Sequence, residues 1–194
     1  MKVEKKTKVK QYSAQEFMTS SKLAVVMRTN ESVNKFLPVF DYLSDKTNLK
    51  DLREKRFRKQ DLPISSRVLN DWCKKGLLID NRENADQWRT FSQIDVAYIH
   101  ILKACRNFGI SIRKLQEAKV SLFTKLGETD FSLIEIAYTY FDKQKEFDDI
   151  HLFVDECGKC NVVRADDMIS MAQHKLMSNN FFILNLNEAW NEKK

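Results

Sequence analysis

The chain of 194 residues and 22.9 kDa is long enough to bury a hydrophobic core without disulfides or a structural metal. Apolar residues make up 43% of it, and only 4 Gly and 2 Pro are present, which excludes collagen-like and low-complexity classes and favours a helix-rich globular protein. The net charge of +6 is uneven, because residues 1–120 carry 25 Lys and Arg against 14 Asp and Glu, whereas residues 121–194 carry 8 against 13. A polyanion would therefore bind the first two thirds of the chain, although charge runs of this kind also occur on surfaces that only face solvent.

The N-terminal end is expected to be a basic flexible tail over residues 1–11. No apolar segment of signal-peptide length follows it, and the chain has no run of about 18 apolar residues of the kind that spans a membrane. The four Cys are therefore expected to be reduced thiols. We expect a cytoplasmic, nucleoid-associated protein with no membrane partner.

Two helices are predicted within residues 12–55, the N-terminal helical segment. Ser13 with Glu16 forms a capping box that starts a helix running to about Met27. A second helix is indicated by apolar residues three and four apart, namely Val33, Phe36, Phe40 and Leu43.

A short helix follows, in which Ser65 is the predicted N-cap and Gly76 the residue that ends it. Its inner face would consist of Val68, Leu69, Trp72 and Cys73. Its outer face would consist of Ser66, Arg67, Asn70, Asp71 and Lys74. Leu77 and Leu78 are expected to start a strand.

A polar loop, "DNRENADQWRTFS" at residues 80–92, places Trp88 next to Arg89. After it, Ser92 and Asp95 form another capping box at the start of an amphipathic helix. The apolar stripe of that helix is Ile94, Tyr98, Ile101, Cys105 and Phe108. Gly109 ends the helix, and Ser111 caps a further helix to about Leu126.

The remaining chain divides into a helical connector at residues 121–150 and a small C-terminal unit at residues 151–194. The segment 131–141 is apolar on most sides, which a dimer partner or the chain's own core could bury. The C-terminal unit is predicted as strand 151–156, strand 161–165, helix 167–178 and strand 181–187. The expected fold is therefore mainly α with small β elements, an α+β protein.

The order of parts in residues 56–120 resembles the MerR-type winged helix-turn-helix family. The family's recognition helix runs as Ser-x-Arg-x-Leu-x-x-aromatic into Gly-Leu-Leu, and this sequence has Ser65, Arg67, Leu69, Trp72 and "GLL" at 76–78. Its wing is matched by Arg82, by Trp88-Arg89 in place of Tyr-Arg, and by "FSQID" at 91–95. Its bend is matched by "RNFGISI" at 106–112, whereas Asp71 stands where a Tyr is common.

The resemblance implies a dimeric, sequence-specific regulator of transcription that binds double-stranded DNA, with RNA polymerase or another protein as a further candidate partner. It also implies dimer formation through a helix after the winged domain, for which residues 113–126 and 131–141 are candidates. A helix fits the major groove, where Arg67 would bind guanine and Asn70 adenine, while Lys and Arg side chains hold phosphates. The expected DNA-binding residues are Ser66, Arg67, Asn70, Lys74, Lys75, Arg82, Trp88 and Arg89.

Two other functions fit the same residues. One is an architectural or excisionase-like DNA-binding protein of a phage or mobile element. The other is a winged-helix module that binds proteins instead of DNA, which Asp71 and the acidic C-terminal third favour. Arg67 could also pair with Asp71 within the helix, and Lys74 and Lys75 could simply be solvated.

The "CGKC" stretch, Cys157 to Cys160, offers only two thiolates where tetrahedral zinc takes four ligands. The flanking strands make a plain β-hairpin the preferred interpretation, with a metal or redox sensor as the alternative. No catalytic grouping and no glycine-rich phosphate loop stand out, so neither an enzyme nor a cofactor is expected.

Overall fold

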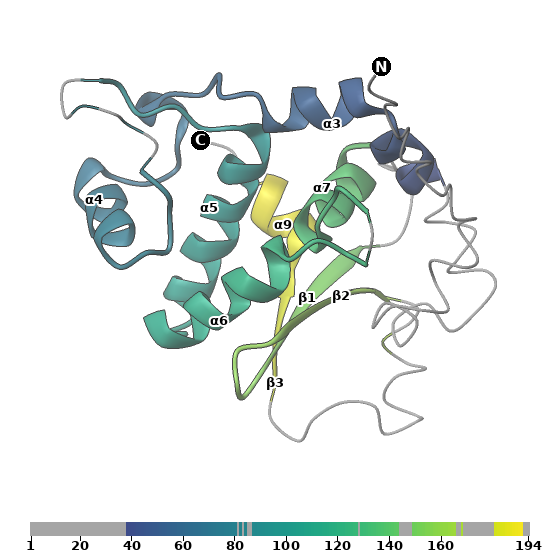
Figure 1. The fold of residues 1–194 in the computed structure, drawn as a ribbon. Helices are drawn as coiled ribbons and strands as arrows, with labels where there is room; N and C mark the ends of the chain where they lie inside the picture. Colours follow the sequence, from purple (N-terminus) through teal and green to yellow (C-terminus); the bar gives the residue numbers. More distant parts are fainter. Residues whose placement is uncertain are drawn as a thin grey trace, which may run out of the picture.

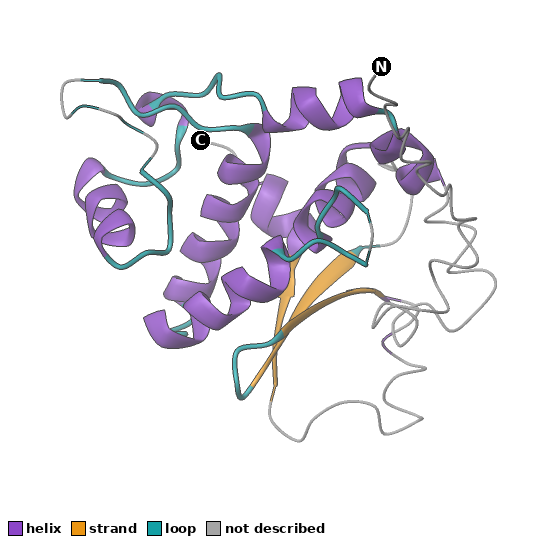
Figure 2. Ribbon diagram, viewed as in Figure 1, coloured by secondary structure: helices purple, strands orange, loops and turns teal. Residues whose placement is uncertain are grey.

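The computed structural model describes residues 38–80, 82, 84, 87–127, 129–143, 149–165, 168 and 181–191. These residues are mainly helical and include a three-stranded antiparallel sheet (Figures 1 and 2). The predicted tail, the helix expected from Ser13 to Met27 and, residue 168 apart, the helix expected at 167–178 lie outside the described residues.

The described part begins with two short helical segments. Residues 38–44 are helical, and helix α3, Lys46–Arg53, follows directly. The Asp45 carboxylate accepts a hydrogen bond from the backbone N–H of Thr47 at 2.8 Å, as an N-cap does. Leu49 and Leu52 are the buried side chains of α3.

Helix α4, Ser66–Lys74, follows a short 3-10 turn, η2, Lys59–Asp61. As predicted, the Ser65 hydroxyl accepts from the N–H of Val68, and Gly76 ends the helix with φ 71°. The N–H groups of Gly76 and Leu77 then donate back to Cys73 O and Trp72 O, which is the Schellman arrangement. The strand expected at Leu77 and Leu78 is therefore wrong, because this stretch closes the helix and both leucines are buried.

Helices α5, Gln93–Asn107, and α6, Ile112–Phe123, form the centre of the molecule. The capping box of Ser92 and Asp95 is confirmed, since each side chain accepts a hydrogen bond from the other's backbone N–H. The apolar stripe of α5 is buried except for Phe108, which is the C-cap and is 70% exposed. Gly109 follows with φ 81°, and Ser111 caps α6 as predicted.

Helix α7, Leu133–Lys143, packs against α5, α6 and strand β2, Cys160–Arg164. Its buried residues are Leu133, Ile134, Glu135, Ile136, Ala137, Thr139 and Tyr140. The chain itself therefore covers most of the apolar surface of α7, which favours the interpretation as a core helix over that as a dimer seam.

The sheet consists of β1, Ile150–Asp155, β2, Cys160–Arg164, and β3, Phe181–Asn185, in the order β2-β1-β3. β1 is antiparallel to both neighbours, with Leu152 opposite Val162 and Leu184. The third strand is shorter than predicted, because residues from Leu186 on turn into a helix.

That helix, α9, Leu186–Asn191, has no counterpart in the sequence-based prediction. It lies between the sheet and α5 (Figure 1), and the indole N–H of Trp190 donates to the carbonyl of Ala97 at 2.9 Å. One hydrophobic cluster includes buried residues of α3 to α7, the sheet and α9. The described C-terminal elements are thus packed on the helices that precede them.

Candidate nucleic-acid interface

The outer face of α4 lies at the edge of the molecule, on the side of α5 away from the sheet (Figure 1). Leu69 and Trp72 are buried beneath it, while Ser66, Arg67, Asn70, Lys74 and Lys75 are exposed. Val68 and Cys73 are half-buried beside them, so the apolar side of α4 faces the core and the opposite side faces solvent. Among the described residues, neither Arg67 nor Lys74 has an ion-pair partner. Both cations are therefore available to a ligand.

Asp71, also on α4, pairs with Lys75 and not with Arg67. The Lys75 Nζ lies 2.7 Å from Asp71 Oδ2, an i,i+4 pair with both side chains about half exposed. The alternative pair between Arg67 and Asp71 is therefore not formed. The pair also offsets the negative charge that Asp71 would present to a phosphate.

Two arginines of the loop after α4, Arg82 and Arg89, converge on one carboxylate, that of Asp80. Arg82 donates to Asp80 through Nε at 2.9 Å and Nη2 at 2.8 Å, and Arg89 donates through Nε at 3.0 Å and Nη2 at 2.7 Å. Hydrogen bonds from Arg82, and then from Arg89, hold the pKa of Asp80 well below its usual range. The same bonds raise the pKa of Arg82.

Arg89 also joins the wing to α4. Its Nη1 donates to the side-chain oxygen of Asn70 at 2.5 Å. Three N–H groups of Arg89 thus have partners inside the protein, and its side chain is only 17% exposed. Arg89 is accordingly fixed between α4 and the loop and does not project freely into solvent. The sequence analysis did not include Asp80 in the site. Its position, two residues before Arg82 and nine before Arg89, was a signal that could have identified it.

Trp88 is 78% exposed, so it does not anchor the loop. The anchor is Phe91, which is 3% exposed and forms a β-bridge with Phe57. Among the described residues of the loop, this bridge is the only strand-like pairing, so a two-stranded wing is not confirmed.

Helix α6 supports the C-terminal end of α4. Gln116 Nε2 donates to Lys75 O, and Lys119 Nζ donates to Gly76 O, each at 2.8 Å. A cation at this position satisfies terminal carbonyls and complements the negative end of the helix dipole. Partial burial lowers the pKa of Lys119. The orientation of α4 is therefore set by α6 as well as by the core.

A hollow of about 610 Å³ lies between α4 and the ends of α5 and α6. Its charged lining residues are Arg67, Asp71, Lys75, Lys103 and Arg106. Lys103 and Arg106 were not among the predicted DNA-binding residues, although they lie three residues apart near the end of a helix. The excess of cations extends the positive face of α4 towards α5.

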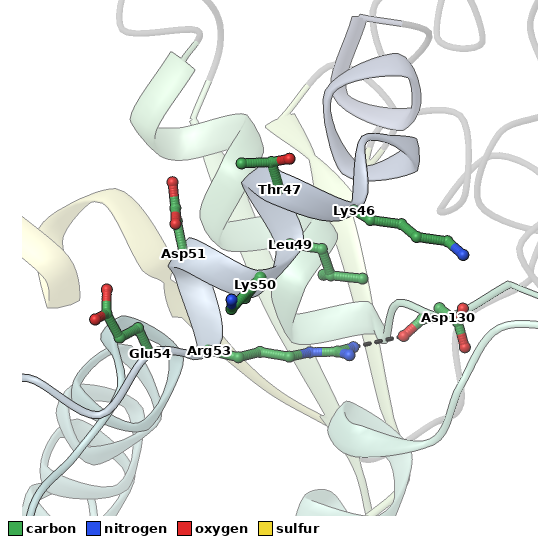
Figure 3. A pocket seen from close by; sticks show the side chains of 8 residues that line it. All are labelled: Lys46, Thr47, Leu49, Lys50, Asp51, Arg53, Glu54 and Asp130. Carbon is green, nitrogen blue, oxygen red and sulfur yellow. Dashed lines mark hydrogen bonds between the residues drawn. The ribbon is translucent and has the colours of Figure 1, made fainter.

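A second hollow, of about 660 Å³, lies on α3 (Figure 3). Arg53 crosses it and donates to the backbone oxygen of Asp130, while Lys46 and Lys50 share it with Asp51 and Glu54. Arg53 also forms two hydrogen bonds with Glu135, at 2.6 and 3.0 Å. The mixed charges of this hollow favour an ion-pair network over an anion site.

The "CGKC" segment forms the tip of the hairpin between β1 and β2, as preferred from the sequence. Cys157 is exposed, whereas Cys160 is buried and its pKa is raised by burial. Burial also raises the pKa of Cys105 to about 12. Within the described ranges, no three His, Cys, Asp or Glu side chains are grouped to hold a metal ion.

No described helix combines the length and the apolar character that crossing a membrane requires.

The chain was compared with protein-family models, curated proteins and solved structures. Residues 59–119 match the model of the MerR HTH family regulatory protein. No curated protein and no solved structure matches the chain. The matched range runs from η2 to the middle of α6, and it includes the exposed face of α4, Asp80, Arg82 and Arg89. The match confirms, over residues 59–119, the resemblance to the MerR family that the sequence motifs indicate.

Proposed function

We propose that this protein is a sequence-specific regulator of transcription that binds double-stranded DNA as a homodimer. The observation that supports this most is the face of α4 within the family match, where Arg67 is exposed without a described ion-pair partner and Lys74 lies two turns along. Arg67 would donate to guanine in the major groove, and Lys74 would hold a phosphate.

The role of Asn70 follows from its contact with Arg89. The amide oxygen of Asn70 accepts a hydrogen bond from Arg89, and this contact orients the Nδ2 group of Asn70 away from Arg89. Asn70 would therefore act chiefly as a donor, to a base acceptor or a phosphate oxygen, and not in the bidentate pairing with adenine expected from the sequence.

The loop contacts would come from Trp88, which is exposed, and from the N–H groups of Arg89 that do not bind Asp80 or Asn70. The charged hollow next to α4 continues the same positive surface. DNA is favoured over a protein partner because cations predominate on this surface and because Asp71 is already paired with Lys75.

Dimer formation would use surface outside the core-facing side of α7. Val120 on α6 is 63% exposed and Phe108 is 70% exposed, so both could contact a second copy. A C2 dimer would place two α4 helices on half-sites of a palindrome, about one helical turn of DNA apart.

The test is selection of binding sites from a random pool of duplexes with the purified full chain, followed by the same selection with Arg67→Ala. We expect a palindromic site for the wild type, and a loss of preference at one position per half-site for the variant, worth about 1–3 kcal/mol. Lys50→Ala, which removes an exposed cation of α3, is the matched control and should leave the site unchanged.

Absence of any salt-sensitive binding to DNA would contradict the proposal. A selected sequence that recurs in phage or plasmid attachment sites, and not in promoters, would instead support the architectural function.

A further inference from the structure

We propose that Asp80 is a specificity-determining residue that holds the wing arginines on a carboxylate and so restrains binding to DNA of arbitrary sequence. This inference rests on the proposed function.

The first observation is how completely the carboxylate is used. Asp80 accepts four side-chain hydrogen bonds from Arg82 and Arg89, and its Oδ1 also accepts from the backbone N–H of Arg82 at 3.4 Å. The carboxylate thus occupies the Nε and Nη2 groups of both arginines. A phosphate binds arginine through the same fork of N–H donors, so Asp80 and a DNA phosphate would compete for them.

The second observation is the charge of the cluster. Among the described side chains of the loop, the carboxylate of Asp80 offsets one of the two positive charges that Arg82 and Arg89 would otherwise present to the backbone of DNA. Each neutralised phosphate contributes about 0.9 to the slope of log affinity against log salt. The cluster should therefore contribute less salt-dependent affinity than two free arginines.

The third observation is shielding. Asp80 is an exposed residue, whereas the side chains of Arg82 and Arg89 are only 25% and 17% exposed, so water screens the two guanidinium groups less than cations at the open surface. Separating them from Asp80 has a cost, because the carboxylate would be left beside a phosphate. Contacts of α4 with a matching base sequence can offset this cost, whereas DNA of arbitrary sequence offers no such contacts. The pairing should therefore increase the ratio of specific to non-specific affinity.

The link to Asn70 connects the two parts of the interface. Arg89 contacts both Asp80 and Asn70, so a shift of Arg89 towards a phosphate would alter the amide that faces the DNA. Contact with the backbone and contact with the bases are thereby coupled through one guanidinium group.

The experiment measures binding of the full chain to a mixed-sequence duplex over a range of salt concentrations. Asp80→Asn keeps the size of the side chain and removes its charge. We therefore expect it to bind DNA roughly tenfold more tightly at 0.1 M salt, with a slope of log affinity against log salt concentration that is steeper by about 0.9. Asp130→Asn is the matched control, because Asp130 is a surface carboxylate paired with Lys125 at 2.9 Å, away from α4. It makes the same change in net charge and should have little effect. Asp80→Glu restores the carboxylate and should restore weak binding.

The outcomes separate this inference from the proposed function. If the wild type binds and Asp80→Asn behaves like Asp130→Asn, or binds more weakly than the wild type with an unchanged slope, the inference is wrong while the function stands. If no variant binds DNA, both are wrong. Binding by Asp80→Asn alone would support both. Thermal melting of each variant shows whether the fold is intact.

Discussion

Two regions of this molecule are held in place by different forces. Around α7 and the sheet, the contacts are apolar, and side chains such as Ile134 and Leu152 are fully buried. Around α4 and the loop after it, ion pairs and hydrogen bonds of Asp80, Arg89 and Lys119 position the residues. Apolar packing tolerates little change of shape, whereas charged contacts can be exchanged for those of a ligand. The difference suggests that the first region provides stability and the second provides binding.

The largest effect on stability should come from shortening a side chain in the apolar region. Ile134→Ala removes buried methyl and methylene groups and should lower the free energy of unfolding by about 2–5 kcal/mol, as measured by denaturant titration. Ile79→Ala, at a position that is 68% exposed near α4, should change it by no more than about 0.5 kcal/mol. An effect of Ile134→Ala that depended on protein concentration would instead place α7 in a dimer interface.

A smaller loss is expected from the ion pair that joins α3 to α7. In Arg53→Met, the Glu135 carboxylate, whose side chain is 5% exposed, keeps its bonds to the N–H and hydroxyl of Ser132 but loses its cation. We expect a loss of about 1–3 kcal/mol, seen as a lower melting temperature. The matched variant Lys50→Met should have the melting temperature of the wild type. An equal decrease in melting temperature in both variants would refute a special role for the pair of Arg53 and Glu135.

The N-caps of α5 and α4 allow the two regions to be compared through smaller expected losses of stability. Ser92→Ala breaks a reciprocal, buried capping box and should lower the free energy of unfolding by about 1 kcal/mol. Ser65→Ala at α4 removes one exposed hydrogen bond of 3.3 Å and should cost less, about 0.5 kcal/mol. Equal losses in chemical denaturation would show that the two regions do not differ in this respect.

The smallest effect on stability is expected at Trp88. Trp88→Ala should leave the free energy of unfolding within about 0.5 kcal/mol of the wild type, because the side chain is 78% exposed. If the loop lies on DNA, the same variant should bind DNA more weakly, as measured by fluorescence anisotropy of a labelled duplex. A loss of stability without a loss of affinity would mean that Trp88 anchors the loop after all.

Local sequence signals accounted for much of the fold. The capping serines at 65, 92 and 111 and the glycines at 76 and 109 lie as predicted, and so do the buried faces of α4 and α5 apart from Phe108, since each depends on residues within one or two helical turns. The hairpin at "CGKC" was also predicted, because its turn and its alternation of side chains are local. Helix α9 was missed, although Asn185 caps it by accepting a hydrogen bond from the N–H of Glu188, because the helix is only six residues long and follows directly after a strand.

The candidate site was predicted less completely than the fold. The sequence alone determined which residues could meet DNA, because helical spacing places Arg67 and Lys74 on the face opposite Leu69 and Trp72. The tertiary structure decided how the charges are used. It brings Asp80 onto Arg82 and Arg89, separates Asp71 from Arg67, exposes Trp88 and buries α7 within the chain. The physical reason is that a charge or an apolar face has several possible partners in a sequence, and only the packing of distant segments selects one of them.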